Sequence, residues 1–280
     1  MIALCPNPFR DINLDFTLRT RQLLSDNGFE CVICPIFSDT VTGKNGNEIP
    51  VVKLEEAENI SLFIVFGGDG TILELVRRLN DYSKPVLGVN LGTKGFMTAL
   101  EPEEFSSILD IAQGHYRISQ RMMIDCSLIR NGTEIYSGYA LNDVVVHGYG
   151  DTIQINVFND NDKMISFSGD GIIASTPTGS TGYSLSAGGP IVEPESRNII
   201  LSPICAHLMS SRSFVVNPER IITVTVEKLH DRKAYLSLDG SNVFDLSNED
   251  VIKVNKSVRT VNMVISEKKN FFELVFEKLS

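Results

Sequence analysis

One stretch constrains the fold of this chain more than any other. Over residues 61–79, an apolar run, a glycine-rich turn and an amphipathic run follow one another. The mostly apolar run 61–66 is typical of a buried parallel strand. The apolar residues at positions 72, 75, 76 and 79 then have the spacing of a helix. Between the two runs lies the turn 67–71, with the sequence GGDGT. A strand–turn–helix junction of this kind lies at the carboxyl end of a parallel sheet, where open α/β folds bind their ligands.

The residue types of this turn indicate phosphate chemistry. Glycines allow backbone N–H groups to approach a phosphate closely, and a helix start favours anions, so Gly67, Gly68 and Thr71 are candidate phosphate-binding residues. Asp69 is different, because a carboxylate repels phosphate and is expected to bind a proton or a metal ion. The turn lacks the lysine of a GxxxxGK[ST] loop and is not a Walker motif. A tight strand-to-helix turn with an Asp helix cap is the structural alternative, and this stretch alone leaves it open.

The length and charge of the chain bound the remaining possibilities. A length of 280 residues predicts two domains, and a hydrophobic content of 42% is ordinary for a globular core. The formal net charge of −10 argues against nucleic acid and anionic membranes as main partners. In so acidic a protein, an anionic substrate would need local cations or Mg²⁺.

Cysteine usage and the N-terminus predict a cytoplasmic protein. The five cysteines are odd in number and scattered, which favours reduced thiols. No apolar run approaches the roughly 20 residues that span a bilayer. The N-terminus reaches Pro6 and Asp11 too soon for a signal peptide.

The order of predicted elements divides the chain into domains of different class. Strand-like runs at 1–5, 29–34, 61–66 and 84–90 alternate with helical segments from about Asp11 or Asn13 to Asn27, at 72–79 and at 101–113, so residues 1–114 are predicted to form an α/β domain with a parallel sheet. From residue 115 to 265, helical spacing is scarce and a β-rich domain is expected. Its predicted strands lie at 122–129, 133–141, 143–147, 152–158, 163–167, 221–226, 234–238, 251–254 and 259–265. The segment 266–280 contains an apolar run at 271–276, which we expect to fold back on the first domain.

A second informative stretch covers residues 168–190 and is rich in glycine, serine and threonine. A flexible linker is one interpretation. It does not explain the strand-like run 172–175, the single aromatic residue Tyr183, or the small residues placed to enter a helix. The stretch offers hydroxyls and unobstructed amides around one aromatic face, and this combination suits a nucleoside.

An amide and a carboxylate stand together at the head of the strand at 143–147. Asn142 and Asp143 are well suited to bind neighbouring ribose hydroxyls. An Asx turn before a strand is the structural alternative.

Taken together, these motifs resemble the NAD kinase family. The resemblance rests on GGDGT, NLGTKGF, LNDVVV and GDGIIASTPTGSTGYSLSAGGPIVEP, in this order and at this spacing. It implies an α/β N-terminal domain, a β-sandwich-like C-terminal domain, a site in the cleft between them, and homo-oligomers, either dimers or tetramers. The implied reaction transfers a phosphoryl group from ATP, or from polyphosphate in some members, to the 2′-hydroxyl of the adenosine ribose of NAD. Mg²⁺ or another divalent cation is the expected cofactor, and the sequence assigns no metal ligand.

The resemblance also implies roles for particular residues. Asp69 matches the proton acceptor for the 2′-hydroxyl, with Gly70 beside it. Asn142 and Asp143 match the pair that holds the ribose, and Asp170 matches an aspartate near the nicotinamide end. The adenine and ribose loop is matched by Thr181, Gly182, Tyr183, Ser184 and Ser186. The family often has alanine where Gly182 stands.

The chain departs from the family at three positions where relatives often carry a cationic or polar donor. These positions are Glu74, Ser168 and Ser241. The departures predict a weak grip on the extra phosphate of NADP, unless Lys94 supplies the missing charge. A lipid or sugar kinase would share GGDGT without needing the second stretch, and a non-catalytic dinucleotide sensor would have no need of Asp69.

Overall fold

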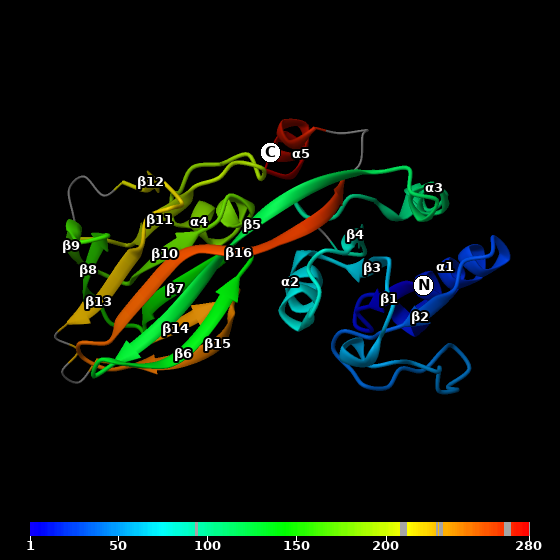
Figure 1. Cartoon of the computed structure of the whole chain (residues 1–280), viewed down its shortest axis with the longest axis horizontal. Coiled ribbons are helices and arrows are strands. Elements are labelled where there is room, and N and C mark those ends of the chain that lie inside the picture. The colour runs from blue at the N-terminus through cyan, green and yellow to red at the C-terminus, as the bar shows by residue number, and fades with distance from the viewer. Residues whose placement is uncertain (93–94, 208–211, 228, 230–231, 266–269, 280) are drawn as a thin grey trace. The chain divides into compact units, whose positions relative to one another are not determined.

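The computed structural model describes residues 1–92, 95–207, 212–227, 229, 232–265 and 270–279. The chain forms two compact units (Figure 1). Unit 1 comprises Met1–Gln120 and Val261–Ser280, and unit 2 comprises Arg121–Thr260. Unit 1 is therefore built from two segments far apart in the sequence, with unit 2 inserted between them.

Unit 1 is organised around a parallel sheet, as the alternating pattern predicted. The strand order is β2-β1-β3-β4-β16, and each neighbouring pair is parallel. The strands are β1 (Ile2–Pro6), β2 (Cys31–Ile33), β3 (Leu62–Gly67), β4 (Pro85–Asn90) and the C-terminal end of β16 (Val251–Ile265). The register places Gly67 of β3 beside Asn90 of β4, so the loops after these strands leave the sheet at adjacent points.

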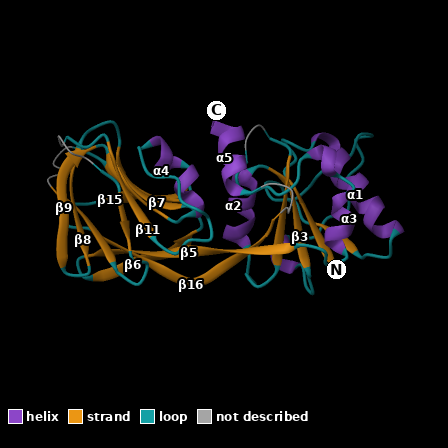
Figure 2. Ribbon diagram, turned by 90° about the horizontal axis from the view of Figure 1, so that it is seen from above, coloured by secondary structure: helices purple, strands orange, loops and turns teal. Residues whose placement is uncertain are grey.

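Helices of unit 1 lie between its strands and, in the case of α5, after the last one. Figure 2 shows them in purple beside the orange strands. They are α1 (Asp15–Asp26), α2 (Asp69–Arg78), α3 (Ser107–Ala112) and α5 (Phe271–Leu279), with 3₁₀ turns η1 (Ile12–Leu14), η2 (Leu54–Glu56) and η3 (Pro102–Glu104). Helix α1 begins at Asp15, later than the predicted start at Asp11 or Asn13. The carboxylate of Asp11 nevertheless accepts the N–H groups of Phe16 and Thr17 in its first turn, each at 2.9 Å.

Unit 2 is a sandwich of two mostly antiparallel sheets, which confirms the expected fold class. One sheet contains β16, β13, β8 and β9, with β5 paired to β16 and to β6, and the other has the order β12-β11-β10-β7-β14-β15. Residues from both sheets, such as Ile155 and Val224 from the first and Val146 and Leu236 from the second, belong to one buried core. The bounds are β5 (Arg117–Arg130), β6 (Thr133–Ala140), β7 (Asp143–Gly148), β8 (Ile153–Asn159), β9 (Asp162–Gly169), β10 (Gly171–Ser175), β11 (Ile199–Ile204), β12 (Phe214–Val216), β13 (Ile222–Glu227), β14 (Ala234–Leu238) and β15 (Ser241–Leu246), with η4 (Thr178–Thr181) and α4 (Tyr183–Ser186) as its helical turns.

Two expectations about elements are wrong, and three strands were not predicted. The predicted strands at 251–254 and 259–265 are one continuous strand, β16, because no glycine or proline interrupts the run between them. The predicted helix at 101–113 is split into η3 and the shorter α3, since Pro102 and the Glu101–Glu104 capping box form a separate 3₁₀ turn. Strands β11, β12 and β15 were not predicted, and β11 contains Pro203, a residue that is unusual in a central strand.

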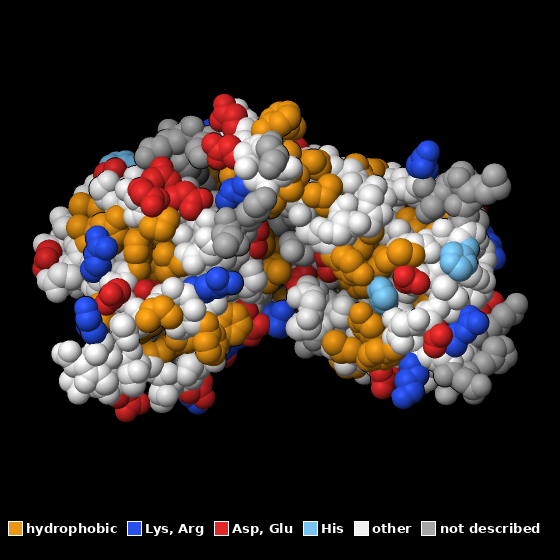
Figure 3. Space-filling model, turned by 180° about the vertical axis from the view of Figure 1, so that it is seen from behind, with side chains coloured by type: hydrophobic (Ala, Val, Ile, Leu, Met, Phe, Trp, Pro, Cys, Tyr) orange, Lys and Arg blue, Asp and Glu red, His pale blue; other side chains and the backbone are white. Residues whose placement is uncertain are grey.

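The surface carries charges of both signs with hydrophobic groups between them. Figure 3 shows this mixture on one face of the molecule. The large hydrophobic side chains that are exposed include Phe9, Val258 and Phe276. Among the described residues, no helix combines the length and the apolar character needed to cross a membrane. All five cysteines are free.

The core of unit 1 supplies a stability prediction. Phe66 of β3 is fully buried, and its ring centroid lies 5.7 Å from that of Phe16. We expect Phe66→Ala to lower the free energy of unfolding by about 3–5 kcal/mol, because it leaves a cavity in the sheet–helix interface. Urea denaturation measures this change. The control is Phe9→Ala, since Phe9 is 75% exposed and its loss should cost no more than about 0.5 kcal/mol. Equal effects of the two substitutions would contradict this description of the core.

Candidate active site

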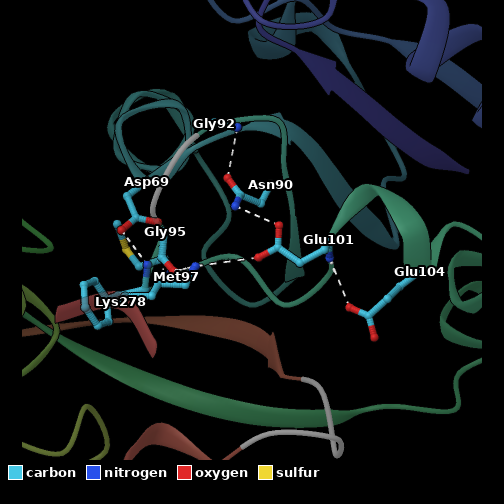
Figure 4. Close-up of polar contacts among 9 residues, drawn as sticks. Asp69, Asn90, Gly92, Gly95, Met97, Glu101, Glu104 and Lys278 are labelled. Atoms are coloured by element: carbon cyan, nitrogen blue, oxygen red, sulfur yellow. Dashed lines mark hydrogen bonds and ion pairs between the residues drawn. The ribbon is translucent and has the colours of Figure 1, made fainter. Parts of the chain in front are cut away.

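The carboxylate of Asp69 is held by a second loop. It is the first residue of α2, after the N-cap Gly68, and no side-chain hydrogen bond caps this helix start. Its Oδ2 atom accepts the N–H of Phe96 at 2.8 Å, and its Oδ1 atom accepts the N–H of Met97 at 3.0 Å (Figure 4). The carboxylate is therefore fixed in orientation by two backbone amides that lie 27 and 28 residues further along the chain.

Some residues of the GGDGT turn are buried and stabilise the turn, whereas others are accessible. A Cβ atom on Gly67 would lie 2.3 Å from Oγ1 of Thr71, so only glycine fits there. Thr71 is buried, and its hydroxyl accepts a hydrogen bond from Nδ2 of Asn7 at 3.1 Å. Gly68 is half-buried and Gly70 is exposed. Of the five residues, Gly67 and Thr71 thus stabilise the turn, while Gly68, Asp69 and Gly70 remain accessible.

The second glycine-rich loop follows β4 and packs closely on Asp69. The Leu91 amide donates to the carbonyl of Gly67 at 2.9 Å, and the Gly92 amide donates to Oδ1 of Asn90 at 3.0 Å. A Cβ atom on Gly95 would lie 2.9 Å from Oδ1 of Asp69. A side chain at position 95 would therefore push the loop off the carboxylate. Lys94, the candidate compensating cation, lies outside the described residues.

In unit 2, one carboxylate organises the predicted ribose-binding pair. The backbone N–H groups of Leu141, Asn142 and Asp143 all donate to the carboxylate of Asp239, at 2.8, 2.8 and 3.0 Å. The Asp239 amide in turn donates to the carbonyl of Asp143 at 3.0 Å. Asn142 and Asp143 therefore stand in a turn built by a residue almost 100 positions away, and not in a turn closed by their own side chains.

The carboxyl group of Asp143 is shifted strongly toward its neutral form. Asp143 is 6% exposed. Burial and, after it, the neighbouring charge of Asp239 together raise the pKa of this carboxyl from its ordinary value to about 7. Near neutral pH, Asp143 can therefore either donate or accept a hydrogen bond.

The serine- and threonine-rich stretch is a packed loop and not a linker. The side chains of Ser175, Thr176, Ser180 and Ser184 are fully buried. The Thr176 hydroxyl donates to the carbonyl of Leu141 at 2.5 Å, and the hydroxyls of Ser184 and Ser202 are hydrogen-bonded at 3.0 Å. Most of these hydroxyls stabilise the loop itself, which differs from the expectation that they serve a ligand. Ser184 in particular packs against β11.

The loop is also fitted against Asn142. The Thr176 amide donates to the carbonyl of Asn142 at 2.8 Å, and a Cβ atom on Gly179 would lie 2.3 Å from the same carbonyl oxygen. Position 182 lies beside the Asn142 side chain, since a Cβ atom on Gly182 would be 3.7 Å from Nδ2. Asn142 and Gly182, which the resemblance assigns to one substrate, therefore lie together.

Tyr183 is the exposed aromatic group of this region. Its side chain is 42% exposed, so it does not belong to the core. Burial of part of the ring, followed by the neighbouring Tyr235, Cys205, Asp170 and Asp143, raises the pKa of its phenol. The predicted residues Asp143, Asp170 and Tyr183 are thus gathered in one place. Near them, Thr181 is half-buried and Ser186 is exposed.

Sequence reasoning missed several residues that position this site. They are Asn90, Gly95 and the amide-bearing Phe96 and Met97 in unit 1, and Asp239 in unit 2. A signal existed for Asn90, because it is the last residue of the predicted strand 84–90 and stands directly before the glycine-rich loop. Asp239 also carried a signal, since Asp239-Gly240 is a hairpin turn pair between β14 and β15, with positive φ at both residues.

The three departures from the family each have a local partner. Glu74 forms an ion pair with Arg77 of the same helix. The Ser168 hydroxyl donates to Oε1 of Gln154 at 2.8 Å, and the Ser241 hydroxyl donates to the carbonyl of Leu238 at 3.2 Å. None of the three residues is itself a cation, and the Arg77 cation beside Glu74 is paired with that carboxylate.

The shifted carboxyl of Asp143 predicts a pH dependence of stability. The unfolded aspartate loses its proton near pH 4, whereas the folded one keeps it up to about pH 7. Between these values the unfolded state binds fewer protons, so this group's contribution to stability is present at low pH and lost as the pH rises through about 7. The asparagine in Asp143→Asn does not titrate, so the variant lacks this pH-dependent contribution to stability.

We therefore expect the free energy of unfolding of the wild type to fall more steeply than that of Asp143→Asn between about pH 4.5 and 7.5, by a few kcal/mol in order of magnitude. Urea denaturation of the two ligand-free proteins at several pH values measures the free energy of unfolding of each. Their difference reports the titration of position 143, because the other ionisable groups are the same in both proteins. Parallel profiles would show that Asp143 titrates normally.

Comparison with known proteins assigns the family. The family models for the ATP-NAD kinase N-terminal domain and C-terminal domain match residues 7–116 and 141–266. A protein named NAD kinase from Caldanaerobacter subterraneus subsp. tengcongensis is 35% identical over 283 residues, covering 100% of this chain and 98% of the relative. Another, from Geotalea daltonii, is 38% identical over 225 residues and covers 79% of each chain.

Two solved structures have the same fold. A yeast NADH kinase, crystallised with NADH, superposes with a TM-score of 0.85 at 24% identity, over 99% of this chain and 86% of the other. An NAD kinase from Archaeoglobus fulgidus, crystallised with ATP, superposes with a TM-score of 0.77 at 27% identity, over 100% and 98%. The two family-model matches and full-length relatives above 30% identity lead to one conclusion: this chain belongs to the NAD kinase family.

Proposed function

We propose that this chain transfers the terminal phosphoryl group of ATP to the 2′-hydroxyl of the adenosine ribose of NAD, giving NADP, with Asp69 as the proton acceptor. The observation that carries the proposal is the Asp69 carboxylate itself. It stands in the GGDGT turn of an NAD kinase family member, with both oxygens oriented by backbone amides.

The geometry of Asp69 suits a general base. A ribose hydroxyl is a poor nucleophile, and a positioned carboxylate contributes roughly 10²–10⁴ in rate. Each carboxylate oxygen has more than one lone pair, so accepting the Phe96 and Met97 amides leaves capacity for the proton of the hydroxyl. The two backbone amides fix the orientation of the carboxylate, and with it the direction of its remaining lone pairs.

We assign the adenosine of NAD to the polar region of unit 2. Oδ1 of Asn142 is buried and has no hydrogen-bond partner among the described residues, which suits it to accept a ribose hydroxyl. Asp143 can donate to or accept from the neighbouring hydroxyl. The ring of Tyr183 offers a stacking face, flanked by Thr181, Gly182 and Ser186. Asp170 lies toward the nicotinamide end in this assignment, and Ser184 supports the loop from behind.

The phosphates of ATP are assigned to the start of α2. The first N–H groups of a helix lack intrahelical partners, and those of Gly68 and Gly70 are accessible to a phosphate. Among the described residues, no three His, Cys, Asp or Glu side chains gather as a metal site. We assign a Mg²⁺ ion to the ATP phosphates, whose charge it would neutralise, since kinases usually bind this ion through the substrate phosphates. ATP is preferred to polyphosphate as donor because the archaeal NAD kinase was crystallised with ATP.

The remaining properties follow from the family resemblance. We assign residues 1–114 to catalysis and phosphate binding, 115–265 to NAD binding and assembly, and 266–280 to a segment that completes the first domain. A cytoplasmic homo-oligomer, dimer or tetramer, is proposed, with no nucleic acid or membrane partner. Exposed hydrophobic side chains of unit 2, such as Val215, Val243 and Val258, are available for an interface between copies.

The direct test is turnover with Asp69→Asn as the matched variant. The wild type should form NADP from NAD, ATP and Mg²⁺, whereas diacylglycerol and fructose phosphate should not be phosphorylated. Asp69→Asn should lower kcat by at least about 10²-fold while NAD still binds, because the amide accepts no proton and can accept only one of the two backbone N–H groups. A coupled assay for NADP and titration calorimetry for NAD provide the two readouts. An unchanged kcat in the variant would exclude Asp69 as the base, and absence of NADP formation by folded wild type would refute the proposed activity.

Tyr183 tests the assignment of the adenosine. Tyr183→Ala should weaken NAD binding by roughly 1–3 kcal/mol, because the ring supplies the stacking face. Tyr183→Phe is the matched control and should bind NAD nearly as the wild type does, since it keeps the ring and removes only the hydroxyl. Calorimetric titration with NAD compares the three proteins. Wild-type affinity in Tyr183→Ala would place the adenosine elsewhere.

A further inference from the structure

The orientation of Asp69 depends on the loop that donates to it. The Phe96 and Met97 amides reach the carboxylate only if the glycine-rich loop after β4 keeps its place. The loop cannot be anchored by a side chain at position 95, where a Cβ atom would lie 2.6 Å from Oγ1 of Thr98 and 2.9 Å from Oδ1 of Asp69. At this position the loop can therefore be held only through its backbone.

Lys278 of α5 provides such an anchor, although it lies 183 residues further along the chain. Its ammonium group donates a hydrogen bond to the carbonyl of Gly95, directly before the two amides that hold Asp69 (Figure 4). Lys278 is only 9% exposed, and Nζ lies 3.7 Å from Oε1 of Glu101. A buried ammonium is costly unless it is paired and hydrogen-bonded, so these partners hold Lys278 at this point.

Glu101 connects this anchor with the other end of the loop. Its Oε2 atom accepts a hydrogen bond from Nδ2 of Asn90 at 2.9 Å, and Oδ1 of Asn90 accepts the Gly92 amide at 3.0 Å. One carboxylate therefore links the side chain that holds Gly92 with the side chain that holds Gly95. All these groups belong to unit 1.

We propose that Lys278 is a positioning residue for phosphoryl transfer. By holding the carbonyl of Gly95, it keeps the Phe96 and Met97 amides on Asp69 and so fixes the direction of the base. The inference rests on the proposed role of Asp69. Lys278 therefore contributes to kcat and contributes little to substrate affinity, because its role is to hold the loop and not to bind a substrate.

The kinetic test uses Lys278→Met, which keeps the length of the side chain and removes its charge. A misplaced base lowers kcat, and we expect a loss of at least about 10-fold with the KM values for NAD and ATP within about 2-fold of the wild type. Lys278→Arg should recover most of kcat, since the guanidinium can also donate to the carbonyl. Lys44→Met, which removes an exposed lysine of the same unit, is the matched control and should keep wild-type kinetics.

Hydrogen exchange of the ligand-free, full-length protein supplies a readout independent of activity. Lys278→Met should speed exchange of the Phe96 and Met97 amides by at least about 10-fold, while amides of the β1 and β3 strands keep their protection. Glu101→Gln removes the charge partner of Lys278. It should speed exchange of the same two amides, and it replaces Lys278→Met if that variant does not fold.

Two outcomes would overturn the proposal. The first is wild-type protection of both amides in the folded variants. The second is faster exchange with an unchanged kcat, provided that Asp69→Asn is inactive. If Asp69→Asn itself keeps wild-type kcat, the role of Asp69 fails, and the exchange data still decide whether Lys278 holds the loop.

Discussion

The hydrogen bonds from two backbone amides to the Asp69 carboxylate are the contacts on which the proposed active site depends. They join the loop after β3 to the loop after β4, and the pairing of Gly67 with Asn90 in the sheet brings the starts of these loops together. The carboxylate of Asp69, the proposed base, is thereby oriented by backbone groups that leave neighbouring strands of the parallel sheet. Donors fixed in this way need no rearrangement during the reaction, which is the general advantage of preorganised polar groups.

In unit 2 an aspartate also accepts backbone amides, and there the arrangement affects the pKa of a neighbouring carboxyl. Asp239 accepts three backbone amides and builds the turn that carries Asn142 and Asp143. Its charge also disfavours ionisation of the buried Asp143 carboxyl, whose pKa rises to about 7. Two neighbouring aspartates therefore have separate tasks, since one is an acceptor for the backbone and the other keeps a proton available near neutral pH.

Local patterns predicted the parts of this fold that depend on neighbouring residues. The strand–GGDGT–helix junction, the parallel sheet and the β-rich second half follow from periodicity and turn residues. The partners of Asp69, Asn142 and Lys278 could not be predicted in this way, because each contact joins residues 27 or more positions apart.

The amino-acid composition of residues 175–184 was a poor guide to which side chains face a ligand. The hydroxyls of residues 175–184 indicated a ligand surface, but many of them are consumed in packing the loop. Only the fold decides which hydroxyls of such a stretch face inward, since small polar residues suit a tight buried turn as well as a binding surface. Tyr183 differs because a large ring at 42% exposure cannot serve as core.

Unit 2 is inserted between the two segments of unit 1, and this arrangement bears on how the protein can be altered by recombination. A single crossover between two relatives would give a unit 1 whose β16 end and α5 come from one parent and whose β1–β4 core comes from the other. Lys278 and Gly95 would then have different ancestries. Intact exchange of a unit needs two crossovers, near residues 120 and 261, and both positions lie in or beside long strands, β5 and β16, instead of loops. Chimeras of this family should therefore tolerate paired junctions better than single ones, even at equal overall identity.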